Sequence, residues 1–317
     1  MTASVRVPAS SSNLGSGFDC VGIAIDRWLT ASVTLGGTGI SIRRRGTLSA
    51  VPVRADQDLF TRGFRAACAV GGAPPGGAGG SATIDAASDI PIGCGLGSSA
   101  AAIVAGALLA DAAFELSLSR AQILEIGTTI EGHPDNIAPA IYGGAVLSVQ
   151  TPAGLVCAPL HVARGIELLI AVPPFPNDTK AARAALPQTL PHTDVAIAAS
   201  RAAALVQGLA SGDGALLGAA LEDVLHVPFR RGQIRGYDAV VTAAKRAGAY
   251  GATLSGAGSA ILAIAPRERA VAVGSALLAA WRLEGVTAEL IRCTRPVSGA
   301  TVTELSQSTH PVATERS

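Results

Sequence analysis

The chain has 317 residues, of which 49% are hydrophobic and 15% charged, and its formal net charge is +1. This length allows two domains with a sizeable core, and this composition excludes an intrinsically disordered chain. The near-neutral charge and an aromatic content of only 3% argue against a nucleic-acid-binding protein, which needs basic patches and stacking side chains.

In the first half of the chain, alternating segments predict strands and helically spaced apolar segments predict helices. We expect strands at residues 4–7, 21–25, 29–35, 40–44, 81–86 and 145–150. We expect helices at residues 58–70, 100–116 and 119–129. Turn-forming residues dominate 8–19, and GGAPPGGAGG at 71–80 is typical of a flexible loop. The triplet Arg43-Arg44-Arg45 follows a strand, so we expect its side chains to be solvated.

The second half of the chain repeats this mixture of elements. We expect strands at residues 166–172 and 286–292, and on both sides of a glycine turn within 251–265. We expect helices at residues 179–185, 194–209, 213–225, 237–247 and 267–281. We therefore predict an N-terminal domain at 1–160, a C-terminal domain at 161–302 and a flexible polar tail at 303–317.

The stretch from Pro91 to Ala100, PIGCGLGSSA, lies between a predicted strand and an apolar helix. Its glycines let backbone N–H groups approach an anion, and the first N–H groups of the helix point the same way. Ser98 and Ser99 add hydroxyls that can cap the helix or bind a cation. The stretch lacks the lysine of a Walker A loop and the spacing of a dinucleotide fingerprint. It predicts either a site for a nucleotide phosphate with its magnesium or a mere helix cap.

Four more polar clusters interrupt the apolar chain, and each also has a plain structural interpretation. Residues 13–19 are typical of a turn, 133–136 of a helix cap, 179–183 of an exposed helix face and 251–259 of a β-hairpin. Together with Glu125 and Arg230, however, they supply the carboxylates and arginines that accompany a phosphate loop in phosphoryl transfer.

Four motifs resemble those of the GHMP small-molecule kinases: PASSSNLGSGFD at 8–19, PIGCGLGSSA at 91–100, EGHPDNIAPAIYGG at 131–144 and LSGAGS at 254–259. The first and third resemble the homoserine kinase branch. The resemblance implies an α+β fold with an N-terminal ribosomal-S5-like domain and a C-terminal ferredoxin-like α/β sandwich. It also implies ATP and Mg²⁺ as cofactors, L-homoserine as the substrate that is phosphorylated in threonine biosynthesis, and a homodimer.

The resemblance further implies which residues hold the two substrates. Asp19 would take the ammonium of homoserine, and Arg183 and Arg230 its carboxylate, through charge-assisted hydrogen bonds. Asn13 and Asn136 would orient the hydroxyl, and Thr179 would touch the phosphoryl end. Magnesium would be held by Ser98 or Ser99 and Glu125. The residues expected to bind ATP are Asp58, Pro91, Ile92, Gly93, Cys94, Gly95, Leu96, Gly97, Ser98, Ser99, Ala100, Gly256, Gly258 and Ser259.

Two positions depart from the family pattern. Asp58 stands where relatives often have an asparagine that reads adenine, and an ionised carboxylate can only accept hydrogen bonds. The adenine contact is therefore expected to survive only in part, and nucleotide preference is left open. Ser259 stands where relatives usually have proline, a change of little expected consequence.

The identity of a general base is the open point of the mechanism. Asp135 would be the choice from the residues alone, since kinases of other families use an aspartate. In homoserine kinases the position facing the acceptor hydroxyl resembles Asn136, which cannot accept a proton. The resemblance therefore implies direct attack on the γ-phosphate without a protein base, with Asp135 in a supporting or capping role.

Other functions remain as alternatives. Another GHMP kinase acting on mevalonate, a sugar or shikimate would leave Asp19 without an ammonium to bind. A non-catalytic ligand-binding relative would be expected to have lost Glu125 or the loop serines. Five scattered cysteines without a CxxC pair fit reduced thiols, and no apolar run reaches the roughly 20 residues of a membrane span. We therefore expect a cytoplasmic protein that is not bound to a membrane.

Overall fold

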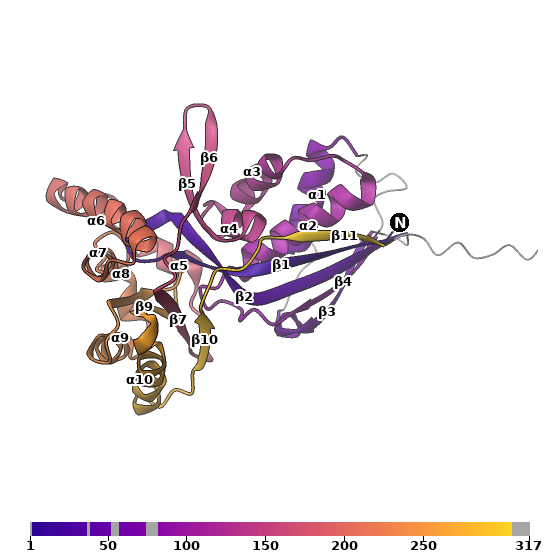
Figure 1. Cartoon of the computed structure of the whole chain (residues 1–317). Coiled ribbons are helices and arrows are strands. Elements are labelled where there is room, and N and C mark those ends of the chain that lie inside the picture. The colour runs from indigo at the N-terminus through magenta and orange to yellow at the C-terminus, as the bar shows by residue number, and fades with distance from the viewer. Residues whose placement is uncertain (1, 37–38, 52–56, 74–81, 306–317) are drawn as a thin grey trace, which may run out of the picture.

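A computed structural model describes residues 2–36, 39–51, 57–73 and 82–305. The part of the chain that it describes forms two β-sheets with helices packed on them (Figure 1). This confirms the α+β class. Most of the glycine-rich loop predicted at 71–80 and most of the predicted tail lie outside the described residues.

The first sheet has seven strands in the order β11-β1-β2-β4-β3, with β5 pairing β2 and β6 pairing β5. Helices α1 to α4 cover one of its faces (Figure 1). The strands are β1 (Thr2–Asn13), β2 (Gly17–Leu35), β3 (Ile40–Gly46), β4 (Ala82–Ser88), β5 (Ala145–Thr151), β6 (Gly154–Leu160) and β11 (Thr301–Leu305). The helices are α1 (Leu59–Val70), α2 (Ser98–Phe114), α3 (Arg120–Glu131) and α4 (Ile137–Tyr142).

Helix α2 is the centre of this domain because it is apolar on nearly every side. Its residues from Ala100 to Ala107 are all buried, which is typical of a helix enclosed by other elements. Close packing against α1 depends on glycine: a Cβ at Gly63 would lie 2.2 Å from the carbonyl oxygen of Ile103. The helix is held rigidly, and its first turn opens onto the cavity described below.

The second sheet is antiparallel in the order β10-β7-β9-β8. Its strands are β7 (Ile166–Val172), β8 (Gly251–Leu254), β9 (Ile261–Pro266) and β10 (Glu289–Cys293). The accompanying helices are α5 (Thr179–Ala184), α6 (His192–Ser211), α7 (Gly214–Ala220), α8 (Val227–Arg230), α9 (Tyr237–Arg246) and α10 (Ala270–Leu283). The order βαββαβ formed by β7, α9, β8, β9, α10 and β10 is that of a ferredoxin-like unit, as expected.

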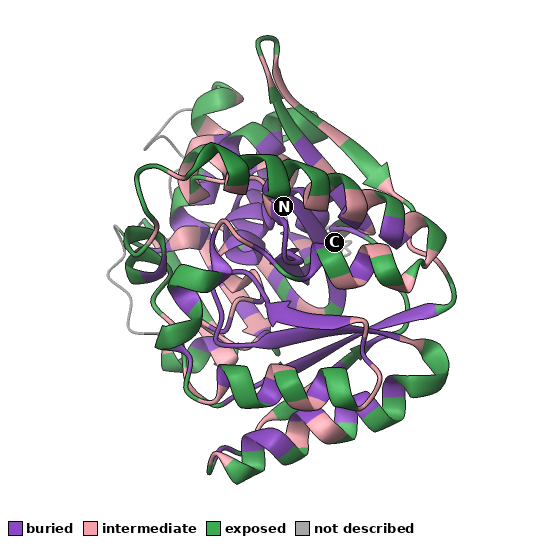
Figure 2. Ribbon diagram, turned by 90° about the vertical axis from the view of Figure 1, so that its left-hand side faces the viewer, coloured by how far each residue is buried: buried purple, intermediate pink, exposed green. Residues whose placement is uncertain are grey.

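Strand β7 is buried on both faces and joins the two hydrophobic cores. Leu168 and Ile170 point into the core shared with the first domain, whereas Leu169 and Ala171 point toward α9 and α10. Figure 2 shows these strands buried between helices whose outer faces are exposed. The second domain is thereby fixed against the first.

Three expectations about the elements were wrong. Residues 8–13 and 17–19 are strand rather than turn, because β1 and β2 form one long hairpin with register shifts near Pro8 and Ser12. Residues 303–305 belong to β11, which pairs with β1, rather than to a tail. Arg44 is only partly exposed and points to the cavity, unlike the exposed Arg43 and Arg45.

Candidate active site

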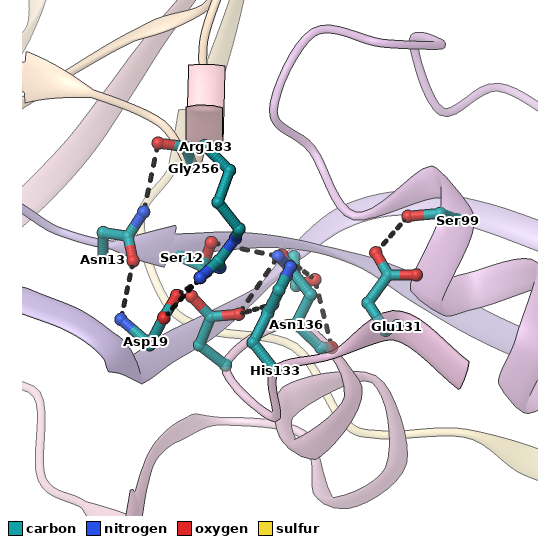
Figure 3. A network of polar contacts seen from close by, with 11 residues as sticks. Ser12, Asn13, Asp19, Ser99, Glu131, His133, Asn136, Arg183 and Gly256 are labelled. Carbon is teal, nitrogen blue, oxygen red and sulfur yellow. Dashed lines mark hydrogen bonds and ion pairs between the residues drawn. The ribbon is translucent and has the colours of Figure 1, made fainter. Parts of the chain in front are cut away.

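A cavity of about 380 Å³ lies where the two domains meet. Residues of both domains line it, from the β1–β2 hairpin, the loop before α2, the end of α3, and the segments near α5, α8 and the turn after β8. Figure 3 shows part of the polar network in this region. The lining residues that carry charge or hydrogen-bonding groups include Ser12, Asn13, Asp19, Arg44, Asp58, Ser98, Ser99, Glu131, His133, Asp135, Asn136, Thr179, Arg183 and Arg230.

The loop before α2 lines the cavity with three glycines. Gly93, Gly95 and Gly97 have φ values of 69°, 76° and 64°, which side chains rarely adopt. Gly97 is the N-cap of α2 and makes no side-chain capping bond, so the first helical N–H groups are not capped by a side chain there. The first turn of α2 therefore lines the cavity without a side-chain cap, an arrangement that suits an anion.

The second domain supports this loop from behind. Ser255 donates its hydroxyl to the carbonyl oxygen of Gly95 at 2.6 Å, and Asn177 donates its backbone N–H to the carbonyl of Gly93 at 2.8 Å. A Cβ at Gly95 would lie 1.9 Å from the carbonyl oxygen of Ser255. Only glycine fits at this contact.

Glu131, not Glu125, is the carboxylate beside the loop serines. Ser99 donates its hydroxyl to Glu131, and both line the cavity (Figure 3). Glu125 is exposed on α3 and does not line the cavity. Six residues at 3.6 per turn separate the two side chains by about 240° around the helix axis. A carboxylate and a hydroxyl are oxygen ligands of the kind that Mg²⁺ prefers, so the residues present fit this ion.

The far end of the cavity is charged. Arg183 binds Asp19 through two hydrogen bonds of 2.8 and 2.9 Å, although the residues lie in different domains (Figure 3). The hydrogen bonds that Arg183 donates to Asp19 raise the pKa of Arg183. Arg230 is 2% exposed, and burial together with nearby Arg183 lowers its pKa. The two arginines and Asp19 form a site that suits a zwitterion.

Asn13 and Asn136 also line the cavity, and hydrogen bonds fix both of their amides. Asn13 donates to the carbonyl of Gly256 at 3.1 Å and accepts the backbone N–H of Asp19 at 3.0 Å. Asn136 donates to the hydroxyl of Ser12 at 3.0 Å and accepts from Ser10 at 2.9 Å. These contacts determine which end of each amide is oxygen.

Asp135 is a cavity residue rather than a helix cap. It is 1% exposed, lines the cavity and accepts a 2.6 Å contact from Nδ1 of His133. Burial lowers the pKa of His133, but the hydrogen bond and charge of Asp135, with smaller contributions from Glu131 and Asp19, raise it overall. The carboxylate of Asp135 therefore favours the charged form of His133.

Asp58 lies at the opposite end of the cavity, beside apolar residues. Its carboxylate caps α1 by accepting the N–H of Thr61 at 2.9 Å and is also paired with Arg44. Leu48 and Leu59 also line the cavity and add apolar surface to it. Arg44 was not foreseen, because its strand position gave no sign of a partner 14 residues away.

Five residues expected to bind ATP do not line the cavity: Pro91, Cys94, Ala100, Gly258 and Ser259. Cys94 is buried behind the loop near the carbonyl oxygens of Pro173 and Phe175, and burial raises the pKa of its thiol. Ser259 is fully buried and donates its hydroxyl to Phe175. Three further polar residues line the cavity that were not expected as site residues, although they lie within the motifs at 8–19 and 131–144: Ser12, Glu131 and His133.

Comparison with known proteins agrees with this geometry. The family model for the N-terminal domain of GHMP kinases matches residues 60–144, and that for the C-terminal domain matches residues 205–283. The chain belongs to the GHMP kinase family. The expected fold family is thereby confirmed.

Similar proteins within this family include homoserine kinases. The chain is 36% identical to the homoserine kinase of Trichormus variabilis, over 95% of this chain and 98% of that one. It is 40% identical to that of Gloeobacter violaceus, over 87% and 92%. A crystal structure of homoserine kinase from Cytophaga hutchinsonii matches with a TM-score of 0.85 and 28% identity, over 95% and 97%. Among the described residues, no helix is both long and apolar enough to cross a membrane.

Proposed function

We propose that this GHMP kinase transfers the γ-phosphoryl group of ATP to the side-chain hydroxyl of L-homoserine and forms O-phospho-L-homoserine. The observation that carries the proposal is one cavity with a phosphate loop in the middle and a zwitterion site at one end. The identity to curated homoserine kinases over nearly the whole chain supports the same acceptor.

The nucleotide would occupy the cavity from its apolar end to the loop. The base would lie near Leu48, Leu59 and Asp58, and the phosphates would accept hydrogen bonds from the loop and the first turn of α2. Ser99 and Glu131 would hold Mg²⁺, with Ser98 beside them. When bound, Mg²⁺ would neutralise charge on the phosphates.

Homoserine would occupy the charged end. Its carboxylate matches Arg183 and Arg230, and its ammonium matches Asp19 and Asp135, whose carboxylates lie with His133 in one cluster of groups within 4.8 Å of each other. Mevalonate, sugars and shikimate have no ammonium, so they would offer Asp19 and Asp135 no cationic partner beyond Arg183 and His133. The charges at this end of the cavity thus favour homoserine over the other acceptors of this family.

The proposed chemistry uses no protein base. The hydroxyl oxygen of homoserine attacks the γ-phosphorus, the bond to the β,γ-bridging oxygen breaks, and the hydroxyl proton passes to a γ-phosphoryl oxygen. Asn13 and Asn136 orient the hydroxyl, and Thr179 lies at the same end of the cavity. Alignment and electrostatic stabilisation then supply the rate enhancement.

ADP release with homoserine, mevalonate, galactose and shikimate tests the proposal. We expect turnover with homoserine and MgATP, and little with the other acceptors. Turnover of another acceptor while homoserine is inert would overturn the proposal. Exchanging ATP for GTP in this assay tests nucleotide preference, and sedimentation of the purified protein tests the proposed homodimer.

A further inference from the structure

The buried wall of the acceptor end contains a histidine that the proposed chemistry does not use. His226 is 0% exposed, and its ring stacks on Phe18 with centroids 5.0 Å apart. Its Nε2 lies 3.1 Å from the carbonyl oxygen of Gly15, and its Nδ1 lies 3.3 Å from Nη1 of Arg230. The ring thereby joins the β1–β2 turn of the first domain to an arginine of the second.

The two partners determine the protonation state of this ring. A carbonyl oxygen can only accept a hydrogen bond, so Nε2 must carry the proton. A guanidinium can only donate, so Nδ1 must offer a lone pair to Arg230. His226 is therefore neutral, with its proton on Nε2.

The charges around the ring agree with this assignment. Burial lowers the pKa of His226 most strongly, and Arg230 lowers it further against the opposing effects of Asp223, the Gly15 carbonyl and Asp19. Asp223 is occupied in accepting the backbone N–H groups of residues 225, 226 and 227 at 3.0, 2.6 and 2.8 Å. It therefore holds the start of α8 in place.

Arg230 is fixed on several sides by these contacts. Its Nε donates to the carbonyl oxygen of Ala182 at 3.1 Å, and its guanidinium carbon lies 5.2 Å from the centroid of the Phe18 ring. The contact with His226 holds Nη1. The remaining guanidinium edge is available to the cavity, which Arg230 lines. The direction of that edge depends on the imidazole behind it.

We propose that His226 is a positioning residue whose neutral imidazole holds the guanidinium of Arg230 in the orientation that binds the acceptor's carboxylate. This inference rests on the proposed function, because it assumes an acceptor with a carboxylate at Arg230. His226 does not line the cavity, so it acts only through Arg230. Its loss is expected to weaken acceptor binding without affecting ATP.

Two amide substitutions separate this role from simple core packing. In His226→Asn, the amide oxygen can take the place of Nδ1 and accept from Arg230. In His226→Gln, the longer side chain reaches toward Gly15 and leaves Nη1 without its acceptor. We expect His226→Gln to raise KM for homoserine roughly 10- to 100-fold, the effect of losing a hydrogen bond to a charged group. We expect His226→Asn to stay within about threefold of wild type, with kcat and KM for ATP little changed in both.

A truncated acceptor tests whether the effect passes through the carboxylate. 3-Aminopropan-1-ol is homoserine without its carboxylate, and its binding can be measured by inhibition of homoserine turnover. We expect wild type and His226→Asn to prefer homoserine strongly, and His226→Gln to lose about tenfold or more of that preference. Equal preference in all three proteins would overturn the inference.

The same experiments distinguish a failure of the proposed function from a failure of the proposed role of His226. If wild type does not phosphorylate homoserine, the proposed function fails. A second outcome is that the wild type phosphorylates homoserine while His226→Asn and His226→Gln raise KM for homoserine equally and lower the unfolding temperature to the same extent. In that case His226 is only a packing residue and the inference fails. If His226→Gln does not fold, ¹⁵N NMR of the His226 imidazole in the wild-type protein tests the proposed protonation state instead. A neutral ring with its proton on Nε2 between about pH 6 and pH 8 supports the role, and a charged ring or a proton on Nδ1 overturns it.

Discussion

At the scale of single residues, Glu131 and Glu125 make a matched pair on one helix. Glu131 faces Ser99 in the cavity, whereas Glu125 is exposed outside it. We expect Glu131→Gln to lower kcat/KM roughly 100- to 1,000-fold, because an electrostatic group at the phosphates would be lost. The Mg²⁺ concentration required for half-maximal rate should also rise.

Glu125→Gln is the control on the same helix. This variant should keep kcat/KM within about twofold of the wild-type value, because a substitution on the exposed surface outside the cavity seldom has a large effect. If Glu125→Gln were the inactive variant and Glu131→Gln the active one, the assignment of the magnesium carboxylate would be reversed.

The substitution Asp135→Asn tests whether the reaction proceeds without a protein base. Its carboxylate contacts His133 and lies in the charged end of the cavity, so Asp135→Asn should weaken binding of the ammonium and raise KM for homoserine. We expect kcat to fall less than roughly 100-fold. Single-turnover rates would measure this directly, and a loss approaching 10⁴-fold would identify Asp135 as a general base.

The sequence predicted the lining of the charged end of the cavity better than the carboxylate that lies beside the loop serines. Asp19, Arg183 and Arg230 all line the cavity. Their charges and their positions in the sequence already indicated a site for a charged substrate. Choosing between Glu125 and Glu131 required the rotation and end point of α3. The pairing of Arg44 with Asp58 required the position of β3 relative to the start of α1, which no local pattern contains.

At the scale of elements, the glycine loop and the turn after β8 support each other. Gly95→Ala would place a methyl group 1.9 Å from the carbonyl oxygen of Ser255 at a φ of 76°. The left-handed conformation alone costs about 1–2 kcal/mol for a residue with a side chain. We expect KM for ATP to rise at least about tenfold, since the N–H groups that hold the phosphates would shift.

Gly72→Ala controls for backbone strain alone. Gly72 has a φ of 74°, but a Cβ there would meet nothing within 4 Å. It should lower the unfolding temperature modestly and leave KM for ATP unchanged. Equal effects of the two substitutions on KM would argue against a role for the loop contact in nucleotide binding.

Elements with a strong local signal were predicted well. The apolar run of α2 and the capping residue Ser119 of α3 gave both helices nearly correct starts. The β1–β2 hairpin was predicted as three short strands and a turn, because Ser, Asn and Gly at 10–17 favour turns locally. Pairing along the whole of both strands overrides that preference.

At the scale of the whole molecule, the last described residues of the chain lie in the same domain as the first. After β10 it returns to the first sheet, and β11 pairs antiparallel with residues 2–6 of β1 (Figure 1). This closure was not predicted because β11 consists of Thr, Val, Glu and Leu without an apolar face of its own. A strand of this kind gains its stability from its partner rather than from its sequence.

Two truncations test how β11 contributes. A chain ending at Ala300 lacks β11 and leaves the edge of β1 unpaired, whereas a chain ending at Leu305 retains it. We expect the shorter chain to unfold at a temperature a few degrees lower, since a loss of about 1–2 kcal/mol corresponds to such a shift in a protein of this size. KM for ATP and homoserine should not change, because β11 does not line the cavity. An activity loss with unchanged thermal unfolding would instead mean that the strand helps to form the site.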